Sequence, residues 1–311
     1  MINIILLLFM NKVIKKKPGR PKSIKKQSAM RRKGIIKTPS NSEHFLEFYY
    51  DNPLIFKKIL YLFKTLSSEK INFIFDKEHI SITTLGHFKK NKILITIDCH
   101  KVNHYYVKKK IEFCLTRNYL SSIFTNINKS HKSITILSKT STKNSLIYIL
   151  LDGDLNIRDE HKIQLTEFSN IPINIKNFMY DDYEIYFKLP GREFKKMISD
   201  IKLFTNIVTL YKTSNNDEDK LTIEYVGNNK QTTSNKYFLN SQAIFLKTKI
   251  KDDKSFRVSF EIDNIKPISS SFLTEEIEIF SKEGMPLLIK ILMFDKAFDI
   301  RILSNIISMQ I

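Results

Sequence analysis

Two segments of the chain, far apart in sequence, carry lysines at the same spacing. Lys57 and Lys64 lie seven residues apart in the first segment, and Lys195 and Lys202 have the same separation in the second. Seven residues are close to two turns of an α-helix, so each pair would lie on one helical face. An ammonium group is a mobile point charge that binds phosphate oxygens without reading bases. The spacing therefore favours a nucleic-acid backbone as the ligand.

Apolar periodicity predicts the two helices that would present these lysines. The helices are expected over 53–66 and 191–204, and each follows a strand pattern, at 45–50 and 183–189. Their buried faces would be formed by Ile55, Ile59, Leu62, Phe63 and Leu66 in the first helix, and by Phe194, Met197, Ile198, Ile201 and Phe204 in the second. Each helix is followed by further strand patterns, so the chain reads as an internal repeat of two similar halves.

Each half contains a second strand–helix–strand module. The shorter helices are expected over 117–127, with Thr116 as N-cap, and over 263–272, which carries Lys266 and is shortened by Pro267. The pattern predicts a first domain at 44–165 and a second at 183–311. The connector at 166–182 is rich in Ile, Pro, Phe and Met; it would either dock a partner or pack on its own domain.

The charge of the chain is concentrated at its amino-terminal end. The formal net charge is +19, and residues 1–40 contain 12 Lys or Arg and no Asp or Glu. Residues 11–43 lack apolar periodicity and cannot bury enough surface to form a core, so a disordered basic tail is expected over 1–43. Within it, Gly19-Arg20-Pro21 is flanked by lysines and resembles an AT-hook, which binds the minor groove of A·T-rich DNA. The alternative is a nuclear-import or general polybasic segment.

Fragments that would suggest an enzyme are incomplete. Asp152-Gly-Asp154 begins like a calcium loop but lacks the later Gly and Glu. His100 and His104 lie in an extended or turn segment without a third ligand, and Tyr180-Asp181-Asp182 falls in the connector. Nucleophile-elbow and phosphate-loop motifs are not found in the sequence. We therefore expect no catalysis, no cofactor and no metal.

The chain resembles the sliding clamps of the PCNA type, and in particular the PCNA-like proteins of African swine fever virus and related large DNA viruses. The resemblance covers about 35–307. It is carried by Gly19-Arg20-Pro21, Arg32-Lys33-Gly34-Ile35, Leu46-Glu47-Phe48, Tyr50-Asp51-Asn52-Pro53-Leu54-Ile55-Phe56-Lys57, Val102-Asn103-His104-Tyr105-Tyr106, Lys188-Leu189-Pro190, Ile171-Pro172 and Pro286-Leu287.

The resemblance implies an α+β clamp fold with two similar domains, each made of antiparallel sheets and two helices. Three copies would form a ring, with the strand near 158–165 of one copy paired to the strand near 236–246 of the next. The helices would line the hole. The implied DNA-binding residues are Lys57, Lys58, Lys64, Arg117, Lys195, Lys196, Lys202 and Lys266, together with Gly19, Arg20 and Pro21 of the tail.

The resemblance also implies a hydrophobic pocket beneath the connector that recruits other proteins. The matching positions are Leu85, Ile171, Pro172, Ile173, Pro286 and Ile302. Ile302 stands where the family usually has an aromatic residue. An ordinary core role is the alternative for all six positions and is favoured for Leu85 and Ile302 taken singly.

Together these patterns predict a DNA processivity factor whose partners are double-stranded DNA, two further copies of the chain, a DNA polymerase and other replication or repair proteins, and not a membrane. Two alternatives remain open. One is a monomeric accessory subunit that binds DNA on an open basic face, and the other is an architectural protein that binds DNA through its tail. The unpaired Cys99 and Cys114 fit a reducing compartment. From the resemblance, that compartment would be a viral replication site in the host cytoplasm or the nucleus.

Overall fold

The computed structural model describes residues 40–66, 69–86, 91–154, 157–166, 182–212, 220–226, 233–239, 245–249, 256–272, 275–293 and 296–307. The AT-hook-like residues Gly19, Arg20 and Pro21 and the connector residues Ile171, Pro172 and Ile173 lie outside these ranges.

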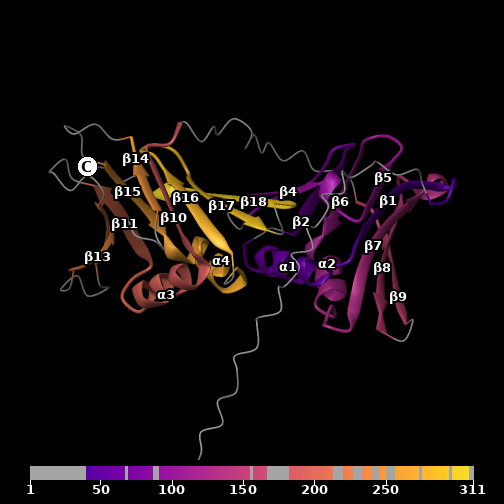
Figure 1. Ribbon diagram of the computed structural model, residues 1–311, viewed down its shortest axis with the longest axis horizontal. Coiled ribbons are helices and arrows are strands. Elements are labelled where there is room, and N and C mark those ends of the chain that lie inside the picture. Colours follow the sequence, from indigo (N-terminus) through magenta and orange to yellow (C-terminus); the bar gives the residue numbers. More distant parts are fainter. Residues whose placement is uncertain are drawn as a thin grey trace, which may run out of the picture. The chain divides into compact units, whose positions relative to one another are not determined.

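The described chain forms strands and four α-helices (Figure 1). The helices are α1 (Leu54–Leu66), α2 (Arg117–Phe124), α3 (Gly191–Lys202) and α4 (Lys266–Ser271). The strands of the first half are β1 (His44–Tyr50), β2 (Lys70–Phe75), β3 (His79–Leu85), β4 (Asn91–Asp98), β5 (His104–Val107), β6 (Ile111–Thr116), β7 (His131–Lys139), β8 (Leu146–Gly153) and β9 (Arg158–Gln164). Those of the second half are β10 (Ile185–Pro190), β11 (Ile207–Lys212), β12 (Lys220–Val226), β13 (Thr233–Leu239), β14 (Phe245–Thr248), β15 (Phe256–Glu261), β16 (Glu276–Ser281), β17 (Leu287–Met293), β18 (Phe298–Ser304) and β19 (Ile306–Ile307).

The strands form three sheets whose neighbours pair antiparallel. One five-stranded sheet has the order β5-β1-β7-β8-β9 and belongs to the first half, and another has the order β13-β12-β11-β15-β19 and belongs to the second. A nine-stranded sheet, β14-β10-β16-β17-β18-β4-β3-β2-β6, combines strands from both halves. Its two parts meet where β18 pairs with β4, from Phe298 opposite Ile97 to Ser304 opposite Asn91. Main-chain hydrogen bonds thus join the two halves.

The helices form a row in the order α2-α1-α4-α3. Helix α1 contacts both α2 and α4, and α3 contacts α4. Figure 1 shows the row along the lower side of the strands. Helices α1, α2 and α3 are amphipathic, so the apolar face of each is buried and its polar face is left outward. On α1 the predicted buried face is confirmed, and Phe56 and Leu60 are buried as well.

One local prediction was wrong. Helix α3 ends at Lys202, so Phe204 lies beyond it and is 43% exposed instead of facing the core. The predicted N-cap of α2 is confirmed, since Thr116 occupies that position, although its side chain makes no capping hydrogen bond. The carbonyl oxygen of Glu69 accepts a hydrogen bond from the backbone N–H of Arg117 instead.

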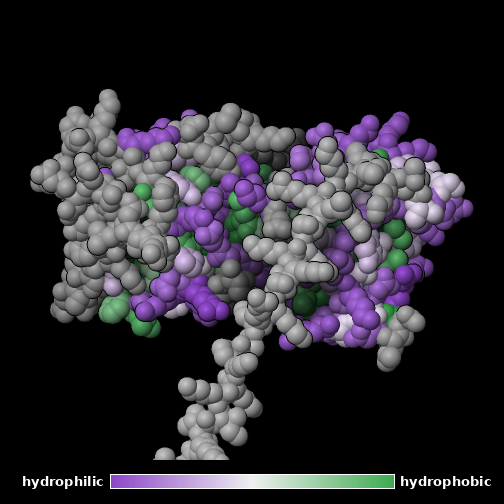
Figure 2. All heavy atoms as spheres, viewed as in Figure 1, coloured by the Kyte–Doolittle hydropathy of each residue, from purple (hydrophilic) through white to green (hydrophobic). Residues whose placement is uncertain are grey.

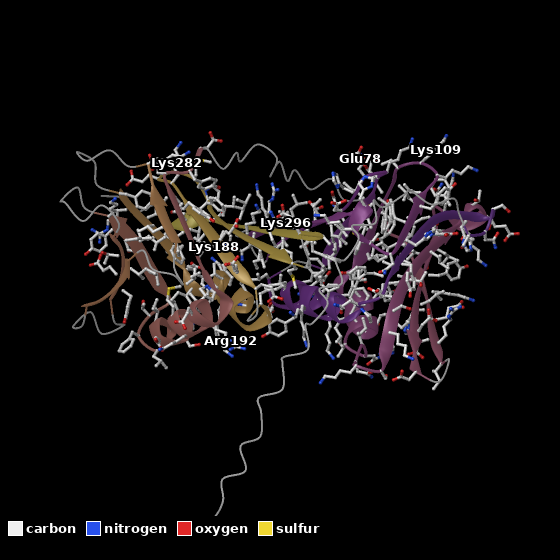
Figure 3. The ribbon with its side chains drawn as sticks, viewed as in Figure 1. Glu78, Lys109, Lys188, Arg192, Lys282 and Lys296 are labelled. Atoms are coloured by element: carbon white, nitrogen blue, oxygen red, sulfur yellow. The ribbon has the colours of Figure 1, made fainter. Side chains whose placement is uncertain are left out.

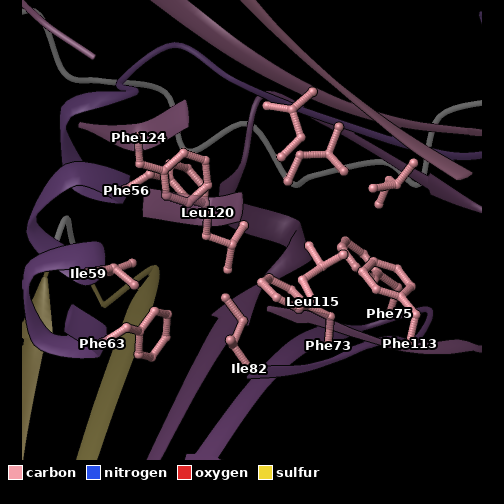
Figure 4. Close-up of a pocket in the computed structure, with 13 residues that line it drawn as sticks. Phe56, Ile59, Phe63, Phe73, Phe75, Ile82, Phe113, Leu115, Leu120 and Phe124 are labelled. Atoms are coloured by element: carbon pink, nitrogen blue, oxygen red, sulfur yellow. The ribbon is translucent and has the colours of Figure 1, made fainter. Parts of the chain in front are cut away.

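Aromatic side chains dominate the core between the first two helices and the sheets. Figure 4 shows Phe56 of α1 beside Phe124 of α2, and their ring centroids lie 5.7 Å apart. Phe73, Phe75 and Phe113 stack on neighbouring strands at the other side of the same space. The cavity among these residues measures about 10 Å³, close to the size of one water molecule. It is a packing gap and not a ligand pocket.

Candidate nucleic-acid interface

The predicted cations lie on the row of helices. Lys57 and Lys64 are exposed on α1, Lys195 and Lys196 on α3, and Lys266 on α4. Lys58, Lys202 and Arg117 are partly buried. The helices present these charges outward because the opposite side of each is occupied by core residues. The structure thus brings residues from distant parts of the sequence onto one basic helical face.

Lys57, Lys58 and Lys202 contact partners within the protein. The ammonium of Lys57 donates a hydrogen bond to the backbone carbonyl of Ile127 at 2.8 Å. Lys58 Nζ lies 2.8 Å from Glu275 Oε1. Lys202 Nζ lies 2.6 Å from Asp263 Oδ1 and also donates to the side-chain oxygen of Asn206. These three lysines therefore hold structural contacts that their spacing in the sequence did not reveal.

Arg192 is a further exposed cation that the sequence analysis missed. It lies in the first turn of α3. Figure 3 shows its side chain pointing away from the strands, whereas the labelled Lys282 and Lys109 lie at the opposite border of the view. Arg192 precedes Lys195 and Lys196 by three and four residues, so the three side chains share one helical face. That spacing is the signal that could have identified it.

The side of the nine-stranded sheet that faces away from the helices carries a separate apolar cluster. Its buried members are Tyr183, Phe280, Leu288 and Leu303, and Leu94, Tyr186 and Met285 pack against them. Burial, reinforced by the charges of Glu278 and Glu276, raises the pKa of Tyr186 to about 12. The Tyr186 hydroxyl therefore stays neutral over the physiological pH range.

The predicted protein-binding positions divide between this face and the core. Leu85 and Pro286 are partly exposed. Ile302 is fully buried and belongs to the main core, so it lines no surface pocket and the core role favoured for it from the sequence is confirmed. Side chains alternate along a strand, and Leu303, the next residue of β18, therefore points to the other face. Leu94 and Leu303 are outer-face residues that the sequence analysis missed.

Strand β9 is an edge strand of the first five-stranded sheet, and β13 is an edge strand of the second. Of the segment near 236–246 that was expected to pair between copies, the residues up to Leu239 lie in β13 and those from Phe245 lie in β14 of the nine-stranded sheet, while 240–244 lie outside the described ranges. Beside β9, a groove of about 390 Å³ is lined by Tyr119, Ser122 and Ile123 of α2 and by residues 160–164.

An exposed apolar patch follows α3. Leu203 is 82% exposed, Ile207 46% and Phe204 43%. The ring of Phe204 lies 5.7 Å from that of Tyr225 on β12, the neighbour of β13. Figure 2 shows hydrophobic surface at the border of the visible face beside α3.

The fragments that resembled enzyme sites make ordinary polar contacts. Asp152 Oδ1 lies 2.5 Å from Arg158 Nε, and Asp154 Oδ1 lies 2.9 Å from Lys132 Nζ. His104 Nε2 lies 2.6 Å from Glu47 Oε2. Among the described residues, no group of three or more His, Cys, Asp or Glu side chains is arranged to hold a metal ion. Within the same ranges, no helix has the length and apolar character needed to cross a membrane.

Comparison with known proteins agrees with this architecture. No family model matches the chain. The structure superposes on PCNA from Thermococcus kodakaraensis with a TM-score of 0.72 at 14% sequence identity, covering 84% of this chain and 100% of that chain. The chain has the PCNA-type clamp fold. The predicted α+β clamp architecture is therefore confirmed.

The sequence also has viral relatives. It is 26% identical over 281 residues to the uncharacterized protein E301R of African swine fever virus, in the isolates Pig/Kenya/KEN-50/1950 and Warthog/Namibia/Wart80/1980. The match covers 88% of this chain and 92% of the relative. The resemblance stated from the sequence is thus confirmed at the level of fold and viral relative.

Proposed function

We propose that this protein is a non-enzymatic DNA sliding clamp that encircles duplex DNA as a homotrimer and tethers a polymerase and other replication or repair proteins. The observation that carries the proposal is the row of four helices, which presents exposed cations from both halves of the chain on one face. The PCNA-type fold supports the same proposed function. Double-stranded DNA is the ligand whose regular phosphate backbone fits such a face.

The two end strands support ring closure. Strands β9 and β13 are each an edge strand of a five-stranded sheet. The backbone N–H and C=O groups along the free side of an edge strand pair readily with another strand. Pairing β9 of one copy with β13 of the next is a head-to-tail contact, which closes a ring when the rotation between copies permits. The expected number of three copies in the ring comes from the resemblance to PCNA.

Weak phosphate contacts suit a protein that moves along DNA. Lysine contacts gain affinity by releasing counterions and do not fix a register on the bases. Closure around the duplex would keep the protein on DNA, and the cations would need to supply only loose contacts. Leu94, Tyr186 and Met285, the partly buried members of the apolar cluster on the opposite side of the sheet, form the surface proposed for recruiting partner proteins.

Sedimentation of the full-length chain, combined with DNA retention, tests this function. A trimer mass of about three times 36.6 kDa is expected, with longer retention on closed circular DNA than on linear DNA of the same sequence. A monomer whose mass does not change with concentration would support the open-face alternative. Deletion of residues 1–43 tests whether the tail alone is responsible for DNA binding. Loss of all DNA affinity on deletion, with no effect of free DNA ends, would contradict the ring.

A further inference from the structure

Two lysines on the helical face meet carboxylates that flank helix α4. Asp263 precedes α4, and its Oδ1 lies 2.6 Å from Lys202 Nζ of α3. Glu275 follows α4, and its Oε1 lies 2.8 Å from Lys58 Nζ of α1. The short central helix thus has an acidic residue on either side, each holding a cation from a neighbouring helix.

The burial of these pairs differs. The side chain of Glu275 is 11% exposed and that of Lys58 36%, so the ammonium compensates the charge of a largely buried carboxylate. Lys202 is 26% exposed, whereas Asp263 is 54% exposed and remains in contact with solvent. Asp263 can therefore be altered with little effect on packing, and Glu275 is the more constrained member.

A carboxylate oxygen at an ammonium group occupies the place that a phosphate oxygen would take. We propose that Asp263 and Glu275 act as internal phosphate mimics, which hold Lys202 and Lys58 away from DNA and so weaken the grip of the helical face. The inference rests on the proposed DNA-binding function. Exposed cations such as Lys64, Lys195 and Lys196 would then make the main phosphate contacts. The two lysines held by carboxylates, Lys58 and Lys202, would contribute only weakly.

The salt dependence of DNA binding measures this effect directly. Each phosphate neutralised on duplex DNA contributes about 0.9 to the slope of log affinity against log salt. We expect Asp263→Asn and Glu275→Gln, made in the full chain, each to steepen this slope by up to about 0.9 because a lysine becomes available. Fluorescence anisotropy of a labelled linear duplex across a KCl series would give the slopes.

Glu276→Gln is the matched control. It removes the same single charge at the adjacent position, but Glu276 pairs with Lys188 of β10, at 2.5 Å. Lys188 alternates with the core residues Phe187 and Leu189, so this pair lies on the side of the sheet that faces away from the helices. The control should therefore keep the wild-type slope.

A double variant tests whether the effect passes through Lys58. In Lys58→Gln/Glu275→Gln the steepening caused by Glu275→Gln should disappear, because no additional ammonium is released. Thermal unfolding of each variant shows whether a changed salt slope comes from the released lysine or from a loss of structure. If Glu275→Gln unfolds, the exposed Asp263→Asn still tests the inference.

The outcomes distinguish the inference from the proposed function. A wild-type chain whose DNA binding does not depend on salt would contradict the function itself. Salt-dependent wild-type binding, with slopes for Asp263→Asn and Glu275→Gln equal to that of Glu276→Gln, would overturn only the inference. Steeper slopes in both variants, lost in the double variant, would support it.

Discussion

The ammonium of Lys57 donates a hydrogen bond to the backbone carbonyl of Ile127, 2.8 Å away, and so ties α1 to the segment that follows α2. Lys195, at the matching position of the second long helix, is exposed, and the structure describes no such contact for it. Two lysines that occupy equivalent places in the sequence repeat therefore have different surroundings in the fold.

This difference predicts different results from the same charge reversal. Lys57→Glu and Lys195→Glu should both weaken DNA binding and reduce its salt slope, by about 0.9 or more for each lost phosphate contact. Lys57→Glu should also lower the free energy of unfolding by about 1 kcal/mol, because it removes the bond to Ile127. Anisotropy and urea unfolding measure the two effects. Lys109→Glu, on an exposed turn away from the helices, is the control and should change neither.

The exposed apolar patch after α3 should contribute to self-association. Leu203→Asp is expected to reduce the trimer fraction without unfolding the chain, because Leu203 is 82% exposed. Tyr119→Asp, in the groove between α2 and β9, should act in the same way from the other side of the contact. Sedimentation velocity measures the masses. Tyr61→Asp, exposed on α1, is the control, and unchanged masses for both test variants would contradict the proposed interface.

Glu47 predicts a loss of stability in acid. Burial would raise the pKa of this carboxyl, but hydrogen bonds from Ser40, His44 and His104 outweigh burial and lower the pKa from 4.5 to about 2. A depressed pKa stabilises the folded state above the unfolded pKa, and the gain disappears as pH falls from about 4.5 to about 2. The contribution amounts to about 3 kcal/mol.

Glu47→Gln should therefore destabilise the protein most at pH 7 and progressively less towards pH 2. Urea unfolding of both proteins at several pH values measures the difference. A difference that stays constant over this range would show that the charge of Glu47 is not the source of the stability.

Gly191 sets how closely α3 approaches the end of α4. A Cβ atom at this position would lie 1.9 Å from the carbonyl oxygen of Phe272, and the N–H of Gly191 donates to the carbonyl of Glu275 at 2.8 Å. Gly191→Ala should cost about 1–3 kcal/mol of stability because backbone atoms must move. Thermal unfolding measures this loss. Arg192→Ala, at the next and exposed position, should leave stability unchanged and reduce only the salt slope of DNA binding.

Local patterns were sufficient to predict the long helices and most of the strands. The apolar spacing of 53–66 and 191–204 corresponds to α1 and α3, because a helix with one apolar stripe can bury only that face. The exposed positions of Lys57, Lys64 and Lys195 follow from the same geometry. The predicted end of the second long helix was wrong: α3 ends at Lys202, and Phe204 lies outside it. Where a helix ends depends on tertiary contacts and not on periodicity alone.

Strand faces could not be assigned from the sequence. Ile302 and Leu303 are both apolar, and only the position of the helices decides which of them enters the main core. The sheets to which β13 and β14 belong were likewise undecided, since β13 pairs with the preceding strand β12 whereas β14 pairs with the distant β10 of the nine-stranded sheet.

The sequence by itself determined the repeated architecture, the basic tail and the helical faces on which the lysines lie, because these depend on composition and on periods of a few residues. Tertiary structure decided which lysines are already paired. Lys58 and Glu275 are 217 residues apart in the chain, and their 2.8 Å contact exists only because packing of α1 against α4 brings the two halves together. The range of an ion pair is a few ångströms in space and is independent of separation along the chain, so no local pattern could have revealed it.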